Sequence, residues 1–284
     1  MNHNMNILPK STLRIALAQV KPDDGNIEGN VEKAIGLIKE AAEKGSKVVV
    51  FPEKFLTGYV PELLNTNVNK YTITRNDNRI GGICHACKEN NIWAIVGSPV
   101  RVEDKVYISS VIINGVGEEV DIYNKTHLFY TEKKVFNSDD NLCILNIDDW
   151  KIGLGICYDS GFPEHSRILA QYGCNLYLVS ALFSKGNGYS ESRIWFPARA
   201  LDNTIYTAMC NFVGKTGIWD SCGSSGVWDP LGKVISEASG DDEELLVVDL
   251  IPEKLKEARA AEQMLVDSFN INYNFNSDKN ILVL

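Results

Sequence analysis

The stretch KIGLGICYDSGFPE, residues 151–164, contains the change from strand to helix on which the fold interpretation rests. Residues 151–157 (KIGLGIC) are apolar and rich in branched side chains, which predicts a buried strand. A helix is predicted from about Pro163 to Gly173, because proline favours helix starts and glycine the position just past helix ends. Residues 175–181 (NLYLVSA) predict the next strand, so the segment is a strand–helix–strand unit.

A similar unit occurs near the start of the chain. Residues 14–20 (RIALAQV) resemble residues 151–157, and residues 47–51 (KVVVF) predict a second buried strand. Between them, apolar residues at spacings of three and four predict a helix that Gly45 ends. We interpret the two units as a weak internal duplication. Further strands are predicted at residues 92–97, 106–114, 119–123, 143–147, 205–212, 225–228, 234–237 and 245–250, and further helices at residues 78–90, 190–202 and after residue 252.

This alternation of strands and helices predicts an α/β fold. No Pro- or Ser-rich linker divides the chain, so residues 11–268 are expected to form a single domain. Residues 1–10 are Asn-rich and are expected to be a flexible leader. The tail, residues 269–284, ends in the apolar sequence ILVL and is expected to pack at an oligomer interface.

Composition excludes several classes of protein. The 284 residues are 44% hydrophobic, which is enough for a sizeable core and argues against a disordered chain. The net charge of −9 would repel phosphate backbones, so no nucleic-acid partner is expected. No apolar run reaches the roughly 18 residues that a membrane helix needs. The seven cysteines are an odd number and do not suggest a disulfide scaffold, so a cytoplasmic location is expected.

Three reactive side chains follow predicted strands. Glu53 comes after the strand KVVVF, Lys125 after the strand near residues 119–123, and Cys157 ends the strand KIGLGIC. Sites in α/β sheets form at the carboxyl ends of strands. Each residue alone also has an ordinary interpretation, as a solvated carboxylate, a surface lysine or a small core residue.

The surroundings of Cys157 favour a catalytic interpretation. A strand, a sharp turn and a helix would hold its thiol exposed at the tip of the turn. The helix N-terminus and a nearby lysine would favour the thiolate. Glu53 would then act as general base, and Lys125 would stabilise a developing oxyanion.

Three motifs in a fixed order resemble the signatures of the nitrilase superfamily of carbon–nitrogen hydrolases. They are FPE at residues 51–53, KTHLF at residues 125–129 and GICYDSGFPE at residues 155–164. The separations of 72 residues from Glu53 to Lys125 and of 32 residues from Lys125 to Cys157 also match. Further similar segments are FLTGY at residues 55–59 and the stretch from PARALDN at residue 197 to CNFVG at residue 210.

The resemblance implies a four-layer α-β-β-α sandwich and a Glu53–Lys125–Cys157 triad, with no metal or organic cofactor. Many members have a second glutamate that positions the substrate and the lysine. Glu132 is the candidate, and the alternative is a charged loop residue beside two lysines. The tyrosines next to the motifs are expected to line the substrate pocket, although they would also fit in a core; they are Tyr59, Tyr130 and Tyr158. Members commonly form homodimers or higher even homo-oligomers.

The implied reaction is hydrolysis of a non-peptide carbon–nitrogen bond in a small linear amide or N-carbamoyl compound. It proceeds through a cysteine thioester and releases ammonia. The Cys-Tyr-Asp sequence at residues 157–159 is the amidase-like form, whereas true nitrilases tend to have Cys-Trp-Glu. Several relatives that bind a substrate carboxylate carry arginine within two residues of the aspartate, where this chain has Ser160 and Gly161. Arg193 or Lys185 are the candidates to compensate.

Other interpretations remain open on the sequence alone. A true nitrilase or a thiol acyltransferase on the same fold is one alternative, and a catalytically silent binding protein is another. The pair Cys84 and Cys87 has C-x-x-C spacing, but it lies in a predicted helix without a second pair, so we expect packing rather than metal binding. His127 is expected to make a structural hydrogen bond.

Overall fold

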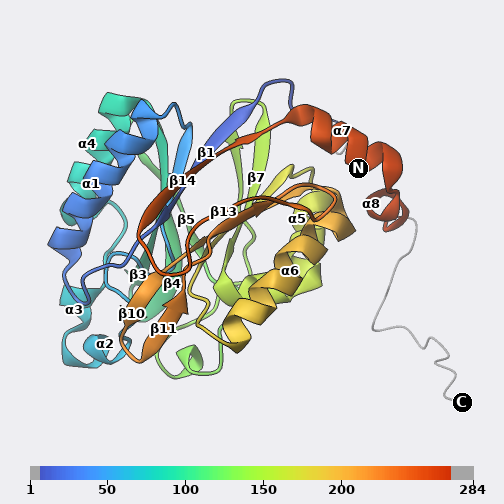
Figure 1. Cartoon of the computed structure of the whole chain (residues 1–284). Helices are drawn as coiled ribbons and strands as arrows, with labels where there is room; N and C mark the ends of the chain where they lie inside the picture. The colour runs from blue at the N-terminus through green and yellow to red at the C-terminus, as the bar shows by residue number, and fades with distance from the viewer. Residues whose placement is uncertain (1–6, 270–284) are drawn as a thin grey trace, which may run out of the picture.

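The computed structural model describes residues 7–269, and two six-stranded sheets lie at its centre (Figure 1). The first sheet contains β1 (Leu13–Gln19), β2 (Val48–Val50), β3 (Trp93–Val102), β4 (Lys105–Ile113), β5 (Glu119–Asn124) and β14 (Glu244–Leu250). The second sheet contains β6 (Ile144–Ile147), β7 (Trp150–Ile156), β8 (Leu176–Ala181), β9 (Tyr206–Asn211), β12 (Gly226–Trp228) and β13 (Val234–Glu237). Their orders are β14-β1-β2-β3-β4-β5 and β13-β12-β9-β8-β7-β6.

The two sheets have the same arrangement of strand directions, which agrees with the interpretation of an internal duplication, although β6 directly precedes β7 and its counterpart β14 is the last strand in chain order. In the first sheet β1, β2 and β3 are parallel neighbours, and in the second sheet β7, β8 and β9 are. Each parallel set has one antiparallel strand on one side, β14 or β6, and two on the other, β4 and β5 or β12 and β13. The similar sequences at the two strand–helix–strand units therefore occupy equivalent places in the two sheets.

Helices cover the outer face of each sheet (Figure 1). They are α1 (Ile27–Glu43) and α4 (Gly81–Asn90) on the first sheet, and α5 (Pro163–Gln171) and α6 (Asn187–Asn203) on the second. Buried side chains of α1 and α4 pack with the outer side of the first sheet, and those of α5 and α6 with the second. Between the sheets lies a third apolar layer to which both contribute, for example Ile15 and Leu154. The predicted four-layer α-β-β-α sandwich is confirmed.

The elements absent from the sequence prediction are short. They are α2 (Glu62–Thr66), α3 (Val68–Tyr71), α8 (Met264–Asp267), the short helices η2 (Glu132–Lys134) and η3 (Cys157–Gly161), and the hairpin of β10 (Val213–Thr216) and β11 (Trp219–Cys222). The helix predicted at residues 78–90 is present as η1 (Asn78–Ile80) followed by α4. An element of one turn shows no helical period, and the hairpin strands are too short and polar to stand out. The predicted helix after residue 252 is α7 (Pro252–Ala261).

The two ends of the chain are described only in part. Residues 1–6 of the predicted leader lie outside the described residues, whereas Leu8 packs against the layer between the sheets and Pro9 is buried. Residues 270–284 of the predicted tail also lie outside them. Within residues 7–269, none of the helices has the length and apolar character needed to cross a membrane.

Candidate active site

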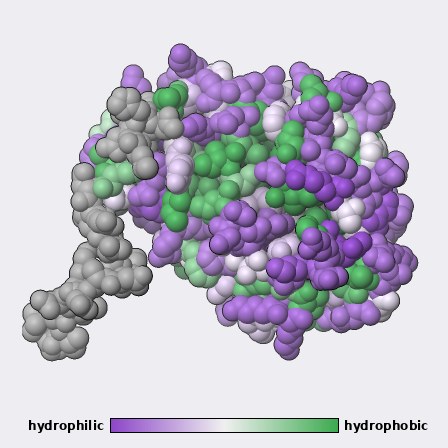
Figure 2. Space-filling view, turned by 180° about the vertical axis from the view of Figure 1, so that it is seen from behind, coloured by the Kyte–Doolittle hydropathy of each residue, from purple (hydrophilic) through white to green (hydrophobic). Residues whose placement is uncertain are grey.

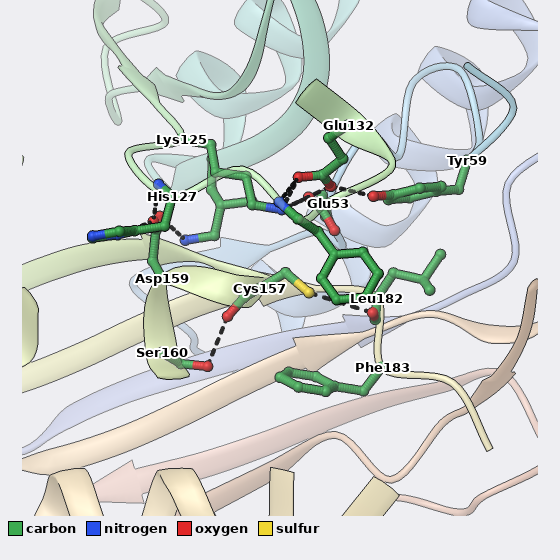
Figure 3. Close-up of polar contacts among 12 residues, drawn as sticks. Glu53, Tyr59, Lys125, His127, Glu132, Cys157, Asp159, Ser160, Leu182 and Phe183 are labelled. Carbon is green, nitrogen blue, oxygen red and sulfur yellow. Dashed lines mark hydrogen bonds and ion pairs between the residues drawn. The ribbon is translucent and has the colours of Figure 1, made fainter. Parts of the chain in front are cut away.

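The structure brings the predicted reactive side chains together at the ends of three strands (Figure 3). Glu53 lies in the loop after β2, Lys125 directly follows β5, and Cys157 directly follows β7. The Nζ atom of Lys125 lies 2.7 Å from Oε1 of Glu53, and both side chains are inaccessible to solvent. The second oxygen of Glu53, Oε2, is buried and has no hydrogen-bond partner within residues 7–269. That oxygen is therefore available to take a proton.

Glu132 joins this group from η2. Its two carboxylate oxygens lie 2.8 and 2.9 Å from Nζ of Lys125. Oε2 also accepts a hydrogen bond of 2.7 Å from the backbone N–H of Phe129, and Oε1 accepts one from the hydroxyl of Tyr59. Glu132 is thus a buried partner of Lys125, and the alternative of a solvated loop carboxylate is wrong.

The sharp turn predicted at Cys157 is present. This residue has a φ of +43°, in the left-handed region that non-glycine residues rarely adopt, and it begins η3. Its Sγ atom donates a hydrogen bond of 3.3 Å to the carbonyl oxygen of Leu182. Upstream in β7, a Cβ atom at Gly155 would lie 2.3 Å from the hydroxyl of Tyr177, so the strand needs glycine there to reach the turn.

Asp159 links the cysteine turn to the lysine loop. Its Oδ1 accepts hydrogen bonds from the backbone N–H of His127 at 2.8 Å and from the His127 ring at 3.0 Å. Its Oδ2 accepts from the Tyr123 hydroxyl at 2.8 Å and from the Ile156 N–H at 3.0 Å. The structural hydrogen bond expected of His127 is confirmed, and one buried carboxylate holds two catalytic loops in a fixed relation.

A glycine allows the glutamate loop its position. A Cβ atom at Gly97 in β3 would lie 2.1 Å from the carbonyl oxygen of Pro52 and 2.6 Å from the backbone nitrogen of Lys54. No larger residue fits there without moving the loop that carries Glu53. The position of Glu53 therefore depends on close backbone packing between the loop and β3.

The pKa values of the two carboxylates beside Lys125 are shifted in opposite directions. Burial raises the pKa of Glu53 to about 7, with a further increase from the charge of Glu132. Burial would also raise the pKa of Glu132, but the charges of Lys125 and Lys54 and the hydrogen bonds from Lys125 and Tyr59 together outweigh burial and lower that pKa below its usual value. This difference in pKa suits Glu53 to proton transfer and Glu132 to remaining negatively charged. For Lys125, burial would lower the pKa, but Glu132 and Glu53 together raise it, so this side chain remains an ammonium.

The thiol of Cys157 does not have the lowered pKa that the sequence predicted. Burial raises its pKa well above the usual value, and the charges of Glu53 and Glu132 add to this effect more than Lys125 opposes it. The expectation of a resting thiolate was therefore wrong, because it considered the lysine and the helix end but not the two carboxylates. A partly buried thiol with a raised pKa needs a neighbouring base to take its proton.

Sequence reasoning missed a second buried lysine, Lys54. Its Nζ atom lies 3.1 Å from the centre of the Tyr59 ring and 5.0 Å from that of Phe136. The ammonium has no hydrogen-bond acceptor within residues 7–269, and burial lowers its pKa to about 8. The only available signal was its place beside Glu53, where a lysine is ordinarily solvated. The buried charges therefore comprise two ammonium groups, Lys54 and Lys125, and two carboxylates.

We expect Lys54→Met to shift the pH profile of the enzyme. The positive charge of Lys54 lowers the pKa of Glu53, so its loss raises that pKa above about 7. A base must be deprotonated to act, and the half-maximum of kcat/KM on the acid side therefore moves to higher pH. Steady-state rates over a range of pH on both sides of neutrality measure this shift. The matched control is Lys47→Met, which removes an exposed lysine, and an unchanged profile in Lys54→Met would contradict the expected coupling.

A cavity of about 270 Å³ opens onto Cys157 and Glu132. All three tyrosines expected at the pocket, Tyr59, Tyr130 and Tyr158, line it. The remaining lining residues are Phe129, Leu182, Phe183, Ser184, Asn187, Gly188, Glu191, Trp195 and Trp219. The aromatic residues of α6 and of the β10–β11 hairpin were not predicted, because neither the buried face of α6 nor the hairpin was identifiable from the sequence.

Neither basic residue considered as a substitute for the missing arginine lines this cavity. Lys185 forms an ion pair of 3.1 Å with Asp241. Arg193 pairs with Glu237 and donates a hydrogen bond of 2.9 Å to the carbonyl oxygen of Ser224. Both side chains are held away from the cavity by these partners, so the idea that they replace the arginine is wrong.

The other cysteines of residues 7–269 pack in the protein interior or at its edge. Cys87 is buried in α4, and Cys84 is partly buried there and packs against the apolar layer of the first sheet, in agreement with a packing role. Among the described residues, no three or more His, Cys, Asp or Glu side chains are grouped so as to hold a metal ion.

Comparison with protein families matches residues 14–260 to the model described as "Carbon-nitrogen hydrolase". The mouse protein named omega-amidase NIT2 is 30% identical over 264 residues, which cover 88% of this chain and 92% of the mouse protein. The crystal structure of Nit3 from Saccharomyces cerevisiae, described as a member of branch 10 of the nitrilase superfamily, has a TM-score of 0.83 and 25% identity; the match covers 90% of this chain and 96% of Nit3. A cysteine-to-alanine mutant of the amidase from Nesterenkonia sp. AN1, solved in complex with butyramide, has a TM-score of 0.78 and 27% identity; the match covers 90% and 98% of the two chains.

Proposed function

The chain belongs to the carbon–nitrogen hydrolase family, and we propose that it hydrolyses a small linear amide or N-carbamoyl compound and releases ammonia. The observation that carries this proposal is Lys125, held between Glu53 and Glu132 beside Cys157 at an open cavity. The mouse omega-amidase and the amidase crystallised with butyramide support an amide substrate. In this proposal residues 11–268 act as one hydrolase domain.

The reaction begins with proton transfer from Cys157 to Glu53. The thiolate attacks the substrate carbonyl carbon, and a tetrahedral oxyanion forms. Lys125 and the backbone N–H of Tyr158, at the start of η3, stabilise this oxyanion. Glu53 returns the proton to the leaving amine, the C–N bond breaks, and ammonia departs from a thioester on Cys157. Water gives a proton to Glu53, attacks the thioester and releases the acid product and the thiol.

Each carboxylate has a separate role in this scheme. Glu53 has a pKa of about 7 and a buried oxygen without a partner in the described chain, so it can exchange protons near neutral pH. Glu132 stays ionised, because Lys125 helps to lower its pKa. Its carboxylate orients the Lys125 ammonium toward the site where the oxyanion forms. The hydroxyl of Tyr59 fixes Glu132 in turn. Tyr59, Tyr130 and Tyr158 form part of the substrate-binding wall.

Ammonia release from a panel of amides, carbamoyl compounds and nitriles tests the reaction class. We expect ammonia from one or more amides or carbamoyl compounds and none from the matching nitriles. Ammonia from nitriles alone would identify a nitrilase, and acyl transfer to an added amine without hydrolysis would identify an acyltransferase. No turnover, together with no selective alkylation of Cys157 by iodoacetamide, would indicate a silent binding protein.

We propose that the protein forms a homodimer or a higher even homo-oligomer. Exposed apolar side chains on the two helices of the outer layer support this, with Tyr172 just after α5 and Ile194 on α6 exposed by 66% and 64%. Figure 2 also shows a hydrophobic patch surrounded by hydrophilic residues on the face opposite that of Figure 1. Apolar surface of this kind is stabilised by association with a second copy.

Light scattering at micromolar concentration is expected to give at least twice the chain mass. Ile194→Asp is expected to lower that mass to one chain, because the interface would have to bury an unpaired carboxylate. Ile218→Asp, at an exposed apolar residue on the β10–β11 turn, is the control and should not change the mass. A monomeric wild-type protein would contradict the proposed assembly.

We also propose a reducing compartment, the cytoplasm. All seven cysteines are free thiols, and the mechanism requires Cys157 to remain one.

A further inference from the structure

The charged side chains that line the cavity at Cys157 are both acidic, whereas the buried ammonium groups of Lys125 and Lys54 lie behind its wall. Among the described residues that line it, the carboxylates are Glu132 and Glu191, and no lysine, arginine or histidine is present. Glu132 is already paired with Lys125. Glu191 is solvent-exposed and has no hydrogen bond or ion pair with any residue of the described chain, and its limited desolvation raises its pKa above the usual value. A carboxylate therefore stands at the cavity without a partner among residues 7–269.

Glu191 lies on the face of α6 that lines the cavity. Asn187, Gly188, Glu191 and Trp195 all line the cavity, and their spacings of three and four residues place them on one face of the helix. Glu191 thus lies one turn from Trp195 on the same face, and Trp195 contacts the ring of Tyr158 next to the nucleophile, with 6.4 Å between ring centres.

The rest of the wall is aromatic. Phe129 packs against Tyr158 and Trp219, with ring centres 5.4 and 6.4 Å apart. Aromatic faces attract cations, and an unpaired carboxylate beside them strengthens that preference. A substrate carboxylate would be repelled, because the described lining residues include two acidic groups and no basic partner.

A neighbouring cavity does not reverse this charge pattern. It has a volume of about 340 Å³ and shares Tyr59, Glu132 and Trp219 with the first cavity. Its own charged residues are one acid, Glu62, and one base, Lys134. These two charges offset each other, so the acidic character near Cys157 remains.

From this arrangement we propose that the substrate carries a protonated amine at the end opposite its amide or carbamoyl group, and that this amine binds between Glu191 and the aromatic wall. The proposal rests on the proposed amide-hydrolysing function. The cavity is at the small end of ligand pockets, so a short aliphatic chain connects the two ends of the substrate. Glu191 is a specificity-determining residue here, because it contacts the substrate far from the reacting carbon.

Three substrates of similar length test the proposal: 5-aminopentanamide, hexanamide and glutaramate, which end in a cation, a methyl group and a carboxylate. We expect the highest kcat/KM for 5-aminopentanamide and the lowest for glutaramate. Glu191→Gln is expected to lower the ratio of kcat/KM for 5-aminopentanamide over hexanamide by about fivefold, the size expected for a partly exposed ion pair. Glu62→Gln, which removes a carboxylate from the neighbouring cavity, is the matched control and should leave the ratio unchanged.

A preference for hexanamide or glutaramate, or an unchanged ratio in Glu191→Gln, would overturn the proposal while leaving the hydrolase function standing. If no amide releases ammonia, the proposed hydrolase function is disproved. A binding measurement then tests separately whether an amine binds beside Glu191. Pentylamine should slow alkylation of Cys157 by iodoacetamide more than pentanol does, and Glu191→Gln should remove this difference. Equal protection by the amine and the alcohol would overturn the subsite.

Discussion

Cys157→Ala is expected to abolish ammonia release while the protein keeps its fold. Without the thiol there is no atom to form the acyl intermediate, and losses after removal of a catalytic nucleophile are on the order of 10⁴-fold or more in kcat. The fold should survive because the side chain is small and its thiol makes one hydrogen bond within the described chain, of 3.3 Å, to the carbonyl oxygen of Leu182. The left-handed backbone at this residue is retained, since alanine carries the same Cβ atom.

Circular dichroism and thermal unfolding check that the variant is folded, and an ammonia assay measures the loss. Cys84→Ala is the matched control, because it removes a partly buried thiol in α4, away from the cavity. We expect the control to keep wild-type rates. Ammonia release by Cys157→Ala at the wild-type rate, with its identity confirmed by mass spectrometry, is incompatible with the proposed mechanism.

The second large effect is expected for Glu53→Gln, which should prevent acylation. An amide cannot accept the thiol proton, and the pKa of Cys157 is raised by burial, so little thiolate forms without the base. General base catalysis is typically worth about 10² to 10⁴ in rate, and a loss in this range is expected. The glutamine keeps the size of the side chain, so the loss reports on proton transfer rather than on packing.

Glu132→Gln should behave differently. The glutamine keeps the shape and one acceptor for Lys125, and the loss of the Glu132 charge lowers the pKa of Glu53. Glu53 therefore stays ionised to lower pH, and some acylation persists, while turnover falls because Lys125 is less well oriented. Mass spectrometry of each variant with a good amide should find an acyl adduct on Cys157 in Glu132→Gln and none in Glu53→Gln. The reverse pattern would mean that the two glutamates have exchanged roles.

The alternation of strands and helices predicted the α/β class, whereas the four-layer sandwich and the Glu53–Lys125–Cys157 triad were implied by the family resemblance. The buried strands before Glu53 and Cys157 are apolar runs, and reactive side chains at the carboxyl ends of strands are typical of α/β sites. These two strands, β2 and β7, lie in different sheets, so the strand pattern alone did not predict that the two side chains meet. Motif order and spacing then brought Lys125 into the same group. The duplication was also visible in the similar sequences of β1 and β7, which occupy equivalent places in the two sheets.

The features that sequence reasoning missed depend on short elements and on burial. Glu132 was not missed, but only the family resemblance predicted it, because it lies on the single turn η2, whose register no periodicity defines. Lys54 has the sequence context of a solvated loop residue, and only the packing of Tyr59 and Phe136 around it reveals a buried ammonium. The raised pKa of Cys157 follows from burial and from two carboxylates far away in the sequence. The place of Glu191 on the cavity wall depends on which face α6 turns to the site.

Identification of the acyl-enzyme tests the central claim most directly. Wild-type enzyme in excess over a good amide substrate is quenched with acid during a single turnover, and its peptides are mapped by mass spectrometry. We expect the mass of the acyl group on the peptide that contains Cys157, and we expect hydroxylamine to remove it, as it does from a thioester. Complete release of ammonia with no acyl group on Cys157 at any time, or with the acyl group on another of the seven cysteines, would contradict it.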